Sequence, residues 1–149
     1  EPGPARDEIP GEGGMTMAAI LFVCRHNACR SQIAEAIGRI QAPVSWVLSS
    51  AGSNPTTQTD PKAGQVLRLH GLGLANGKPK GFLVLPLIEW DYVVDISCEK
   101  AGASVRTKNY VAWDLADPLD GPMELYEKLF SDLNTRIREL FRGIEESAG

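Results

Sequence analysis

The sequence predicts an α/β fold, a single three-layer domain in which helices flank a four-stranded parallel sheet. The chain has 149 residues, a length that suits one domain. Hydrophobic residues make up 43% of it and charged residues 23%, which is the balance of a globular protein. Short apolar runs alternate with amphipathic segments, as they do in βαβ units. This alternation predicts a parallel sheet that is covered on both faces.

Four apolar runs predict the strands of this sheet. The first contains no polar residue, which is typical of a strand buried on both faces. The second is closed by Ala51 and Gly52, and the fourth is short. The predicted strands cover residues 18–23, 44–49, 92–96 and 109–113.

Three amphipathic segments predict helices, over residues 31–41, 61–70 and 122–144. The second has Asp60 as its N-cap and Pro61 in its first turn, and it ends at Gly71. Residues 77–90 contain two prolines and predict only a short helix near Leu87. The apolar faces consist of Ile33, Ile37 and Ile40 in the first helix, Val66, Leu67 and Leu69 in the second, and Leu125, Leu129, Leu133, Ile137, Leu140 and Ile144 in the third.

Charge and composition exclude several classes of protein. Residues 1–14 hold one base and four acids, and so carry −3 of the net charge of −4. We interpret them as a disordered extension or a cloning remnant ahead of a domain over residues 15–149. The nearly neutral remainder disfavours nucleic-acid binding, and no apolar run is long enough to span a membrane. Three scattered cysteines disfavour a secreted disulfide framework, so we expect a cytoplasmic protein with thiols available for chemistry.

The segment that follows the first strand, Cys24-Arg25-His26-Asn27-Ala28-Cys29-Arg30-Ser31, has the composition of an oxyanion site. Ligands of parallel sheets bind beyond the carboxyl ends of the strands. A short turn from strand to helix directs backbone N–H groups inward, and the helix N-terminus adds partial positive charge. Arg30 can bind two oxygens at once. We therefore expect the anion to be bound by Arg25, His26, Asn27, Ala28, Cys29 and Arg30.

A positive environment of this kind favours the thiolate of a cysteine, which makes Cys24 a nucleophile for a bound phosphate or arsenate. The simpler alternative is a structural cysteine with a solvated arginine nearby. The position of the loop between a buried strand and an amphipathic helix favours the catalytic interpretation. Zinc is disfavoured, because the cysteine and histidine spacings form no recognised ligand set and Arg25 and Arg30 would repel a cation.

Other residues have more than one interpretation. Asn27 suits a left-handed loop residue that braces the turn. Ser31 is either a helix N-cap or a hydroxyl donor to Cys24. Cys29 is either a small buried residue or a redox partner of Cys24, and Cys98 is either a resolving thiol or inert. Asp117, extended before a proline, can protonate a leaving oxygen, with Asp114 as the alternative acid.

Four segments resemble those of the low-molecular-weight protein tyrosine phosphatase superfamily and of the arsenate reductases within it. They are residues 20–31, Ser50-Ala51-Gly52-Ser53, residues 91–96 and Asp117-Pro118. The resemblance implies that Asp117 is the general acid and that Ser50 hydrogen-bonds the loop from outside.

Two details favour the reductases. Gln32-Ile33-Ala34-Glu35 follows Ser31, and Trp113-Asp114 precedes Leu115-Ala116-Asp117-Pro118, whereas the aromatic pair that often follows Asp-Pro in the phosphatases is absent. His26 departs from the family, which usually has glycine there. Thioredoxin-coupled reductases use two downstream cysteines, and only Cys98 is present here.

The resemblance therefore implies an arsenate reductase without a bound cofactor. The second thiol would be Cys29 or Cys98, or an external thiol, either a glutathione-like thiol with glutaredoxin or thioredoxin. The first alternative is a phosphatase that acts on phosphotyrosine or aryl phosphates through a phosphocysteine intermediate. The second is an oxyanion-binding or redox-sensing module without turnover, which His26 favours.

Overall fold

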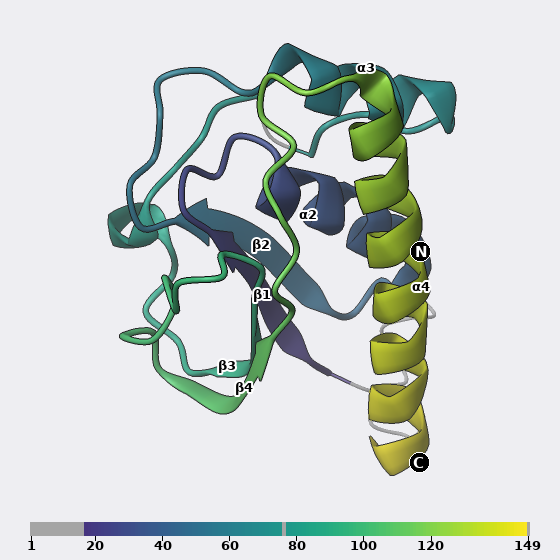
Figure 1. Ribbon diagram of the computed structural model, residues 1–149. Coiled ribbons are helices and arrows are strands. Elements are labelled where there is room, and N and C mark those ends of the chain that lie inside the picture. Colours follow the sequence, from purple (N-terminus) through teal and green to yellow (C-terminus); the bar gives the residue numbers. More distant parts are fainter. Residues whose placement is uncertain (1–16, 76, 149) are drawn as a thin grey trace.

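The computed structural model describes residues 17–75 and 77–148 of the chain (Figure 1). The interpretation of residues 1–14 lies outside these residues. The elements are β1 (Ala19–Cys24), α2 (Arg30–Gln41), β2 (Val47–Gly52), α3 (Pro61–Leu69), the 3-10 helix η1 (Phe82–Val84), β3 (Trp90–Asp95), β4 (Thr107–Ala112) and α4 (Met123–Ala148).

The four strands form one parallel sheet, as predicted, and their order in it is β2-β1-β3-β4. The apolar strand β1 lies in the interior of the sheet, paired with β2 on one side and β3 on the other. Cys24 at the end of β1 lies opposite Gly52 at the end of β2, and Val23 lies opposite Asp95 at the end of β3. The carboxyl ends of these strands therefore meet at one edge of the sheet, where the loop from Cys24 to Cys29 begins.

Helices α2, α3 and α4 cover one face of the sheet, with α2 and α4 packed together on that side (Figure 1). Ile20 and Phe22 of β1 point into this larger core, among residues such as Ile37 and Leu133 that are at most 2% exposed. A smaller core on the opposite face contains Leu21 and other strand residues. It is covered by Phe82, Leu85, Ala101 and Val105, from η1 and the turns after β3.

The second strand begins three residues later than predicted. Trp46 donates its N–H to the carbonyl of Pro43 (3.1 Å), which makes residues 43–46 a turn, and Val44 is 77% exposed. Ala51 and Gly52 belong to the strand, because they pair with the last residues of β1. The third and fourth strands begin two residues earlier than predicted and end one residue earlier.

Parts of the predicted apolar helix faces are exposed. Ile40, Leu69 and Leu125 are 69%, 67% and 47% exposed, because they lie in the first or last turns of their helices, beyond the packed stretches.

The predicted short helix near Leu87 is wrong, since the 3-10 helix ends at Val84. Leu85 precedes a proline and is extended, which ends the helix before Leu87.

The N-cap prediction for the second helix is confirmed, because the carboxylate of Asp60 accepts the N–H of Lys62 (3.0 Å). No helix in the described part of the chain is long and apolar enough to cross a membrane.

Candidate active site

The loop from Cys24 to Cys29 turns its carbonyl groups outward. Four of them accept hydrogen bonds from backbone N–H groups of the segment after β2. The pairs are Cys24 with Ser53 (3.3 Å), Arg25 with Asn54 (2.7 Å), His26 with Thr56 (3.3 Å) and Ala28 with Asp60 (2.9 Å). In a trans peptide the next N–H points opposite to the carbonyl, so the N–H groups that follow these carbonyls face the inside of the loop. Together with the N-terminus of α2 they form a cradle for an anion.

Asn27 holds this loop from within. Its φ is 53°, in the left-handed region as predicted, and its side chain is fully buried. Its Nδ2 donates to the hydroxyls of Ser31 (2.7 Å) and Ser50 (3.0 Å), while its Oδ1 accepts the N–H of Lys80 (2.9 Å). The amide therefore has a single orientation, which joins α2, β2 and the segment around Lys80.

Ser31 connects this network to Cys24. Its hydroxyl lies 3.0 Å from Cys24 Sγ, and the sulfur is almost completely buried. Because a thiolate can only accept hydrogen bonds, Ser31 donates to Sγ whenever Cys24 is ionised, while it accepts from Asn27. The N-cap interpretation of Ser31 is wrong, since the cap of α2 is Cys29.

The network continues to a buried carboxylate that was not predicted as part of the site. Ser50 donates to Glu35 Oε1 (2.6 Å), and Arg39 binds Oε2 through Nε (3.0 Å) and Nη2 (2.7 Å). The sequence did contain a signal for this part of the network. Ser31, Glu35 and Arg39 are spaced four residues apart, so they lie on one side of α2.

Arg30, in the first turn of α2, is 6% exposed and is held by the carboxyl-terminal loops of the sheet. Its Nη1 donates to the carbonyls of Ile96 (2.9 Å) and Leu115 (3.0 Å), and its Nη2 lies 3.8 Å from Asp117 Oδ2. These contacts fix the plane of the guanidinium. The carboxylate of Asp117 accepts a hydrogen bond from the N–H of Leu119 (3.1 Å), and this contact orients it.

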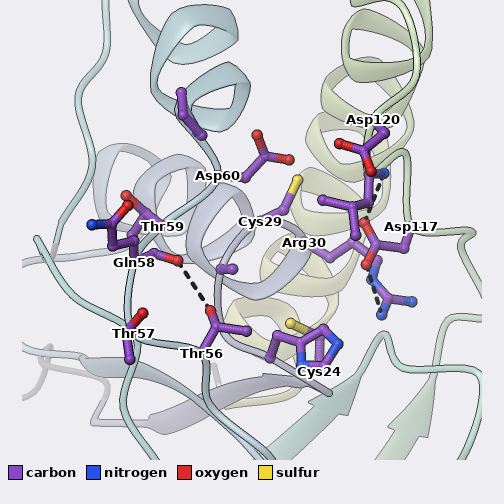
Figure 2. A pocket seen from close by; sticks show the side chains of 14 residues that line it. Cys24, Cys29, Arg30, Thr56, Thr57, Gln58, Thr59, Asp60, Asp117 and Asp120 are labelled. Atoms are coloured by element: carbon purple, nitrogen blue, oxygen red, sulfur yellow. Dashed lines mark hydrogen bonds and ion pairs between the residues drawn. The ribbon is translucent and has the colours of Figure 1, made fainter.

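These side chains line a pocket of about 350 Å³ (Figure 2). Cys24 lies at its lower end in this view, and Arg30 and Asp117 lie on the right side. Three predicted loop residues, His26, Ala28 and Cys29, also line it. The remaining residues were not predicted as part of the site: Thr56, Thr57, Gln58, Thr59, Asp60, Pro61, Leu119 and Asp120.

Other predicted residues do not line the pocket. Asn27, Ser31 and Ser50 lie behind the loop, where their contacts support it. The side chain of Arg25 is about half exposed and approaches Glu99 (3.6 Å). Asp114, the alternative acid, lines a neighbouring pocket.

The two further thiols occupy different environments. Cys29 lines the pocket, but burial raises the pKa of its thiol strongly, and the carboxylates of Asp60 and Asp117 raise it further. Cys98 is exposed, has a φ of 65°, and lies 3.5 Å from the Leu115 carbonyl that also holds Arg30. It lies close to the site without lining the pocket.

Comparison with known proteins agrees with the resemblance. The low molecular weight phosphotyrosine protein phosphatase family matches residues 19–148. An arsenate reductase of Staphylococcus aureus (strain Newman) is 25% identical over 130 residues, covering 83% of this chain and 95% of the relative.

Two solved structures extend this comparison. An arsenate reductase from Archaeoglobus fulgidus DSM 4304 has a TM-score of 0.72 and 27% identity, covering 82% of this chain and 98% of that one. A thioredoxin-dependent arsenate reductase of Corynebacterium glutamicum has a TM-score of 0.70 and 30% identity, covering 92% of this chain and 66% of that one. The protein is thus an enzyme of arsenate reductase or phosphatase type. It belongs to the low molecular weight phosphotyrosine protein phosphatase family, with arsenate reductases among its relatives.

Proposed function

We propose that the protein is an arsenate reductase in which Cys24 attacks an arsenate bound by the loop and by Arg30. The observation that carries this proposal is the convergence of Cys24, Arg30 and Asp117 on one pocket, although Asp117 is remote from the other two in sequence. The inward N–H groups of the loop supply the remaining donors for a tetrahedral anion.

The first step forms a bond between Cys24 and arsenic. The thiolate attacks As(V), an As–O bond breaks, and Asp117 gives its proton to the departing oxygen, which leaves as water. Ser31 stabilises the attacking thiolate through its hydroxyl. Because carbonyls occupy Nη1 of Arg30, its Nε and Nη2 hydrogens are the ones available to two arsenate oxygens.

The second step reduces arsenic. A second thiolate attacks the sulfur of Cys24, the S–As bond breaks, and its electron pair remains on arsenic as As(III), which leaves as arsenite. A further thiol then reduces the mixed disulfide on Cys24. We propose that these thiols are external, either a glutathione-like thiol with glutaredoxin or thioredoxin. The raised pKa of buried Cys29 and the position of Cys98 outside the pocket support this choice.

The second candidate is a phosphatase, which the description of the matching family favours. Cys24 would form a phosphocysteine, and Asp117 would later deprotonate the water that hydrolyses it. Of the described residues that line the pocket, none is Phe, Tyr or Trp, so the walls offer little stacking surface to a phenyl ring. This composition supports a small oxyanion over an aryl phosphate.

One experiment separates the candidates. The purified protein is given arsenate with each thiol system, and an aryl phosphate in parallel. We expect arsenite without release of phosphate. Release of phosphate without arsenite would establish the phosphatase instead, and neither product would indicate an oxyanion-binding or redox-sensing module.

A further inference from the structure

We propose that the outer part of the Cys24 pocket selects the thiol co-substrate, and that Asp60 and Asp120 favour a small thiol carrying a positively charged amine. This inference rests on the proposed function and narrows it: it favours an aminothiol over a glutathione-like thiol, whose two carboxylates give it a net negative charge, as the donor that reaches Cys24 directly. The fold family implies an external or internal thiol but assigns no such class.

The first argument is space. A tetrahedral oxyanion fills roughly 150 Å³, if each of its five heavy atoms takes about the 30 Å³ share of a water molecule. The pocket holds about 350 Å³. The oxyanion at Cys24 and Arg30 therefore leaves room for a second small molecule. This room is bounded by residues 56–60 on one side and by Asp120 on the other (Figure 2).

The second argument is charge. Three carboxylates line the pocket, and Asp117 lies 3.8 Å from Arg30, the guanidinium at its base. Asp60 and Asp120 remain to set the sign of the charge in the outer part, and the charge of Asp60 acts on Cys29 there. The ammonium of Lys62, which is not among the lining residues, donates to the carbonyl of Gly121 (2.6 Å). This ammonium lies beside the residue that follows Asp120 and offsets one of the two carboxylates, so the outer part keeps one net negative charge, which favours an ammonium group over a carboxylate.

The position of Asp60 is fixed by contacts around it. Its carboxylate accepts the N–H of Lys62 (3.0 Å) as the cap of α3, and it accepts the hydroxyl of Tyr126 from α4. Its charge also acts on the pocket, since it contributes to the raised pKa of Cys29. A preorganised carboxylate discriminates between ligands better than a mobile one, because it does not turn away from an unfavourable charge.

The third argument is access. The incoming thiolate must approach the sulfur of Cys24, which is buried at the base of the pocket. A thiol from solvent reaches it through the opening that contains Asp60 and Asp120. With an aminothiol, the new S–S bond forms while the S–As bond breaks, so the electron balance is that of the step described above. The ammonium remains beside the two carboxylates during the attack.

The test uses a variant with Cys29→Ser and Cys98→Ser, in which Cys24 is converted to its mixed disulfide with thionitrobenzoate. Release of thionitrobenzoate is followed with cysteamine, 2-mercaptoethanol and 3-mercaptopropionate at equal thiolate concentration. We expect the rates to fall in that order. Asp120→Asn should lower the ratio of cysteamine to 3-mercaptopropionate rates about fivefold, and the intrinsic reactivities of the thiols cancel in this comparison. Asn tolerates the left-handed φ of 63° at this position.

Two controls keep the result interpretable. Asp132→Asn removes a carboxylate that lines only the neighbouring pocket, and it should leave the ratio unchanged. If the double variant does not fold, the same rate ratio is measured for arsenite release by the unmodified chain at low and high salt. Screening at high salt should reduce the ratio.

An unchanged ratio in Asp120→Asn, or a faster reaction with 3-mercaptopropionate, would overturn the inference. Failure to release arsenite with any thiol, while the thionitrobenzoate ratio shifts as expected, would count against the proposed function alone.

Discussion

At the residue scale, the structural contacts of Arg30 are compatible with the binding role that we propose for it. Its Nη1 is saturated by two carbonyls from the loops after β3 and β4, and the rest of the guanidinium is left for the pocket. A lysine at this position could not bridge the two carbonyls and also bind two anion oxygens, because an ammonium is a point charge without the planar fork.

We therefore expect Arg30→Lys to lower kcat/KM by about 10²–10³-fold although the charge is conserved. Steady-state kinetics with arsenate, together with oxyanion binding measured by calorimetry, would test this. Kinetics close to those of the unaltered protein would mean that Arg30 does not hold the anion.

Cys24→Ser should abolish turnover, at least about 10³-fold, because a serine hydroxyl is a poor nucleophile without a nearby base. Oxyanion binding should persist, since Arg30 and the loop N–H groups remain. Equilibrium binding beside a turnover assay separates the two effects. Substantial activity in this variant would contradict the assignment of Cys24.

Cys98→Ser should keep arsenate reduction within about twofold when an external thiol is supplied, because Cys24 accepts attack from any thiolate that reaches it. Cys29→Ser is the matched control. If Cys98→Ser stops turnover with every donor and Cys29→Ser does not, Cys98 is the resolving thiol. Mass spectrometry of a trapped Cys24–Cys98 disulfide would then establish this directly.

At the scale of elements, the end of β2 supports the catalytic loop by lying directly against it. A Cβ at Gly52 would lie 2.6 Å from the carbonyl oxygen of Arg25, 2.8 Å from the N of Asn27 and 2.9 Å from the carbonyl carbon of His26. All three are backbone atoms, so the loop would have to move as a whole.

Gly52→Ala should therefore lower kcat/KM by about 10²-fold or more, because a displacement of about 1 Å disrupts a preorganised site. Gly143→Ala in α4 is the control, since a methyl group added there would have no neighbouring atom of the described chain within 4 Å, and it should stabilise the helix by about 0.5–1 kcal/mol. Kinetics for both variants and urea unfolding would check these expectations. Unchanged kinetics in Gly52→Ala would show that the loop is not held by β2.

The sequence predicted the elements better than their boundaries. A continuous apolar run identifies β1 and apolar periodicity identifies the centre of α4, because these residues are buried in the core. The start of β2 depends on its register with β1, in which Ala19 pairs with Val47. This pairing is a contact between residues that are distant in sequence, so the local pattern does not reveal it. The exposure of Ile40 likewise depends on where the neighbouring elements end, and the sequence around Ile40 does not predict those ends.

At the scale of the whole molecule, the candidate site was predictable where it is local in sequence. The loop, its left-handed Asn27 and the contact of Ser31 with Cys24 follow from one short motif. The pocket walls at residues 56–60 and Asp120 come from distant segments, and only the folded chain brings them together. Their residue types, threonines and aspartates, are common in loops and carry no signal by themselves.

Stability should depend on pH through Asp95 at the end of β3. Burial would raise the pKa of this carboxyl, but hydrogen bonds from Ser97, Tyr110 and Gly102 outweigh burial and lower it below the usual 3.8. Because the folded-state pKa is lowered, the carboxylate stabilises the fold above pH 4. This contribution is lost as the pH falls below that value.

Asp95→Asn should therefore destabilise the protein at pH 7 by roughly 1–3 kcal/mol, since an amide cannot replace a carboxylate acceptor of several hydrogen bonds. The difference between the two proteins should narrow at pH 3. Urea unfolding at both pH values measures this, and a difference that is the same at pH 3 and pH 7 would show that Asp95 is not the titrating group.

The parallel order of the strands also affects how the enzyme is made. Every pairing in the sheet joins strands separated by a connecting segment, and none is a hairpin. On the ribosome, β1, its loop and β2 emerge early, but the carbonyls of Ile96 and Leu115 that anchor Arg30 emerge much later. Cys24, the proposed nucleophile, is therefore made before Arg30 can be anchored. A chain released before Leu115 thus carries the proposed catalytic motif without the contacts that hold Arg30 in place.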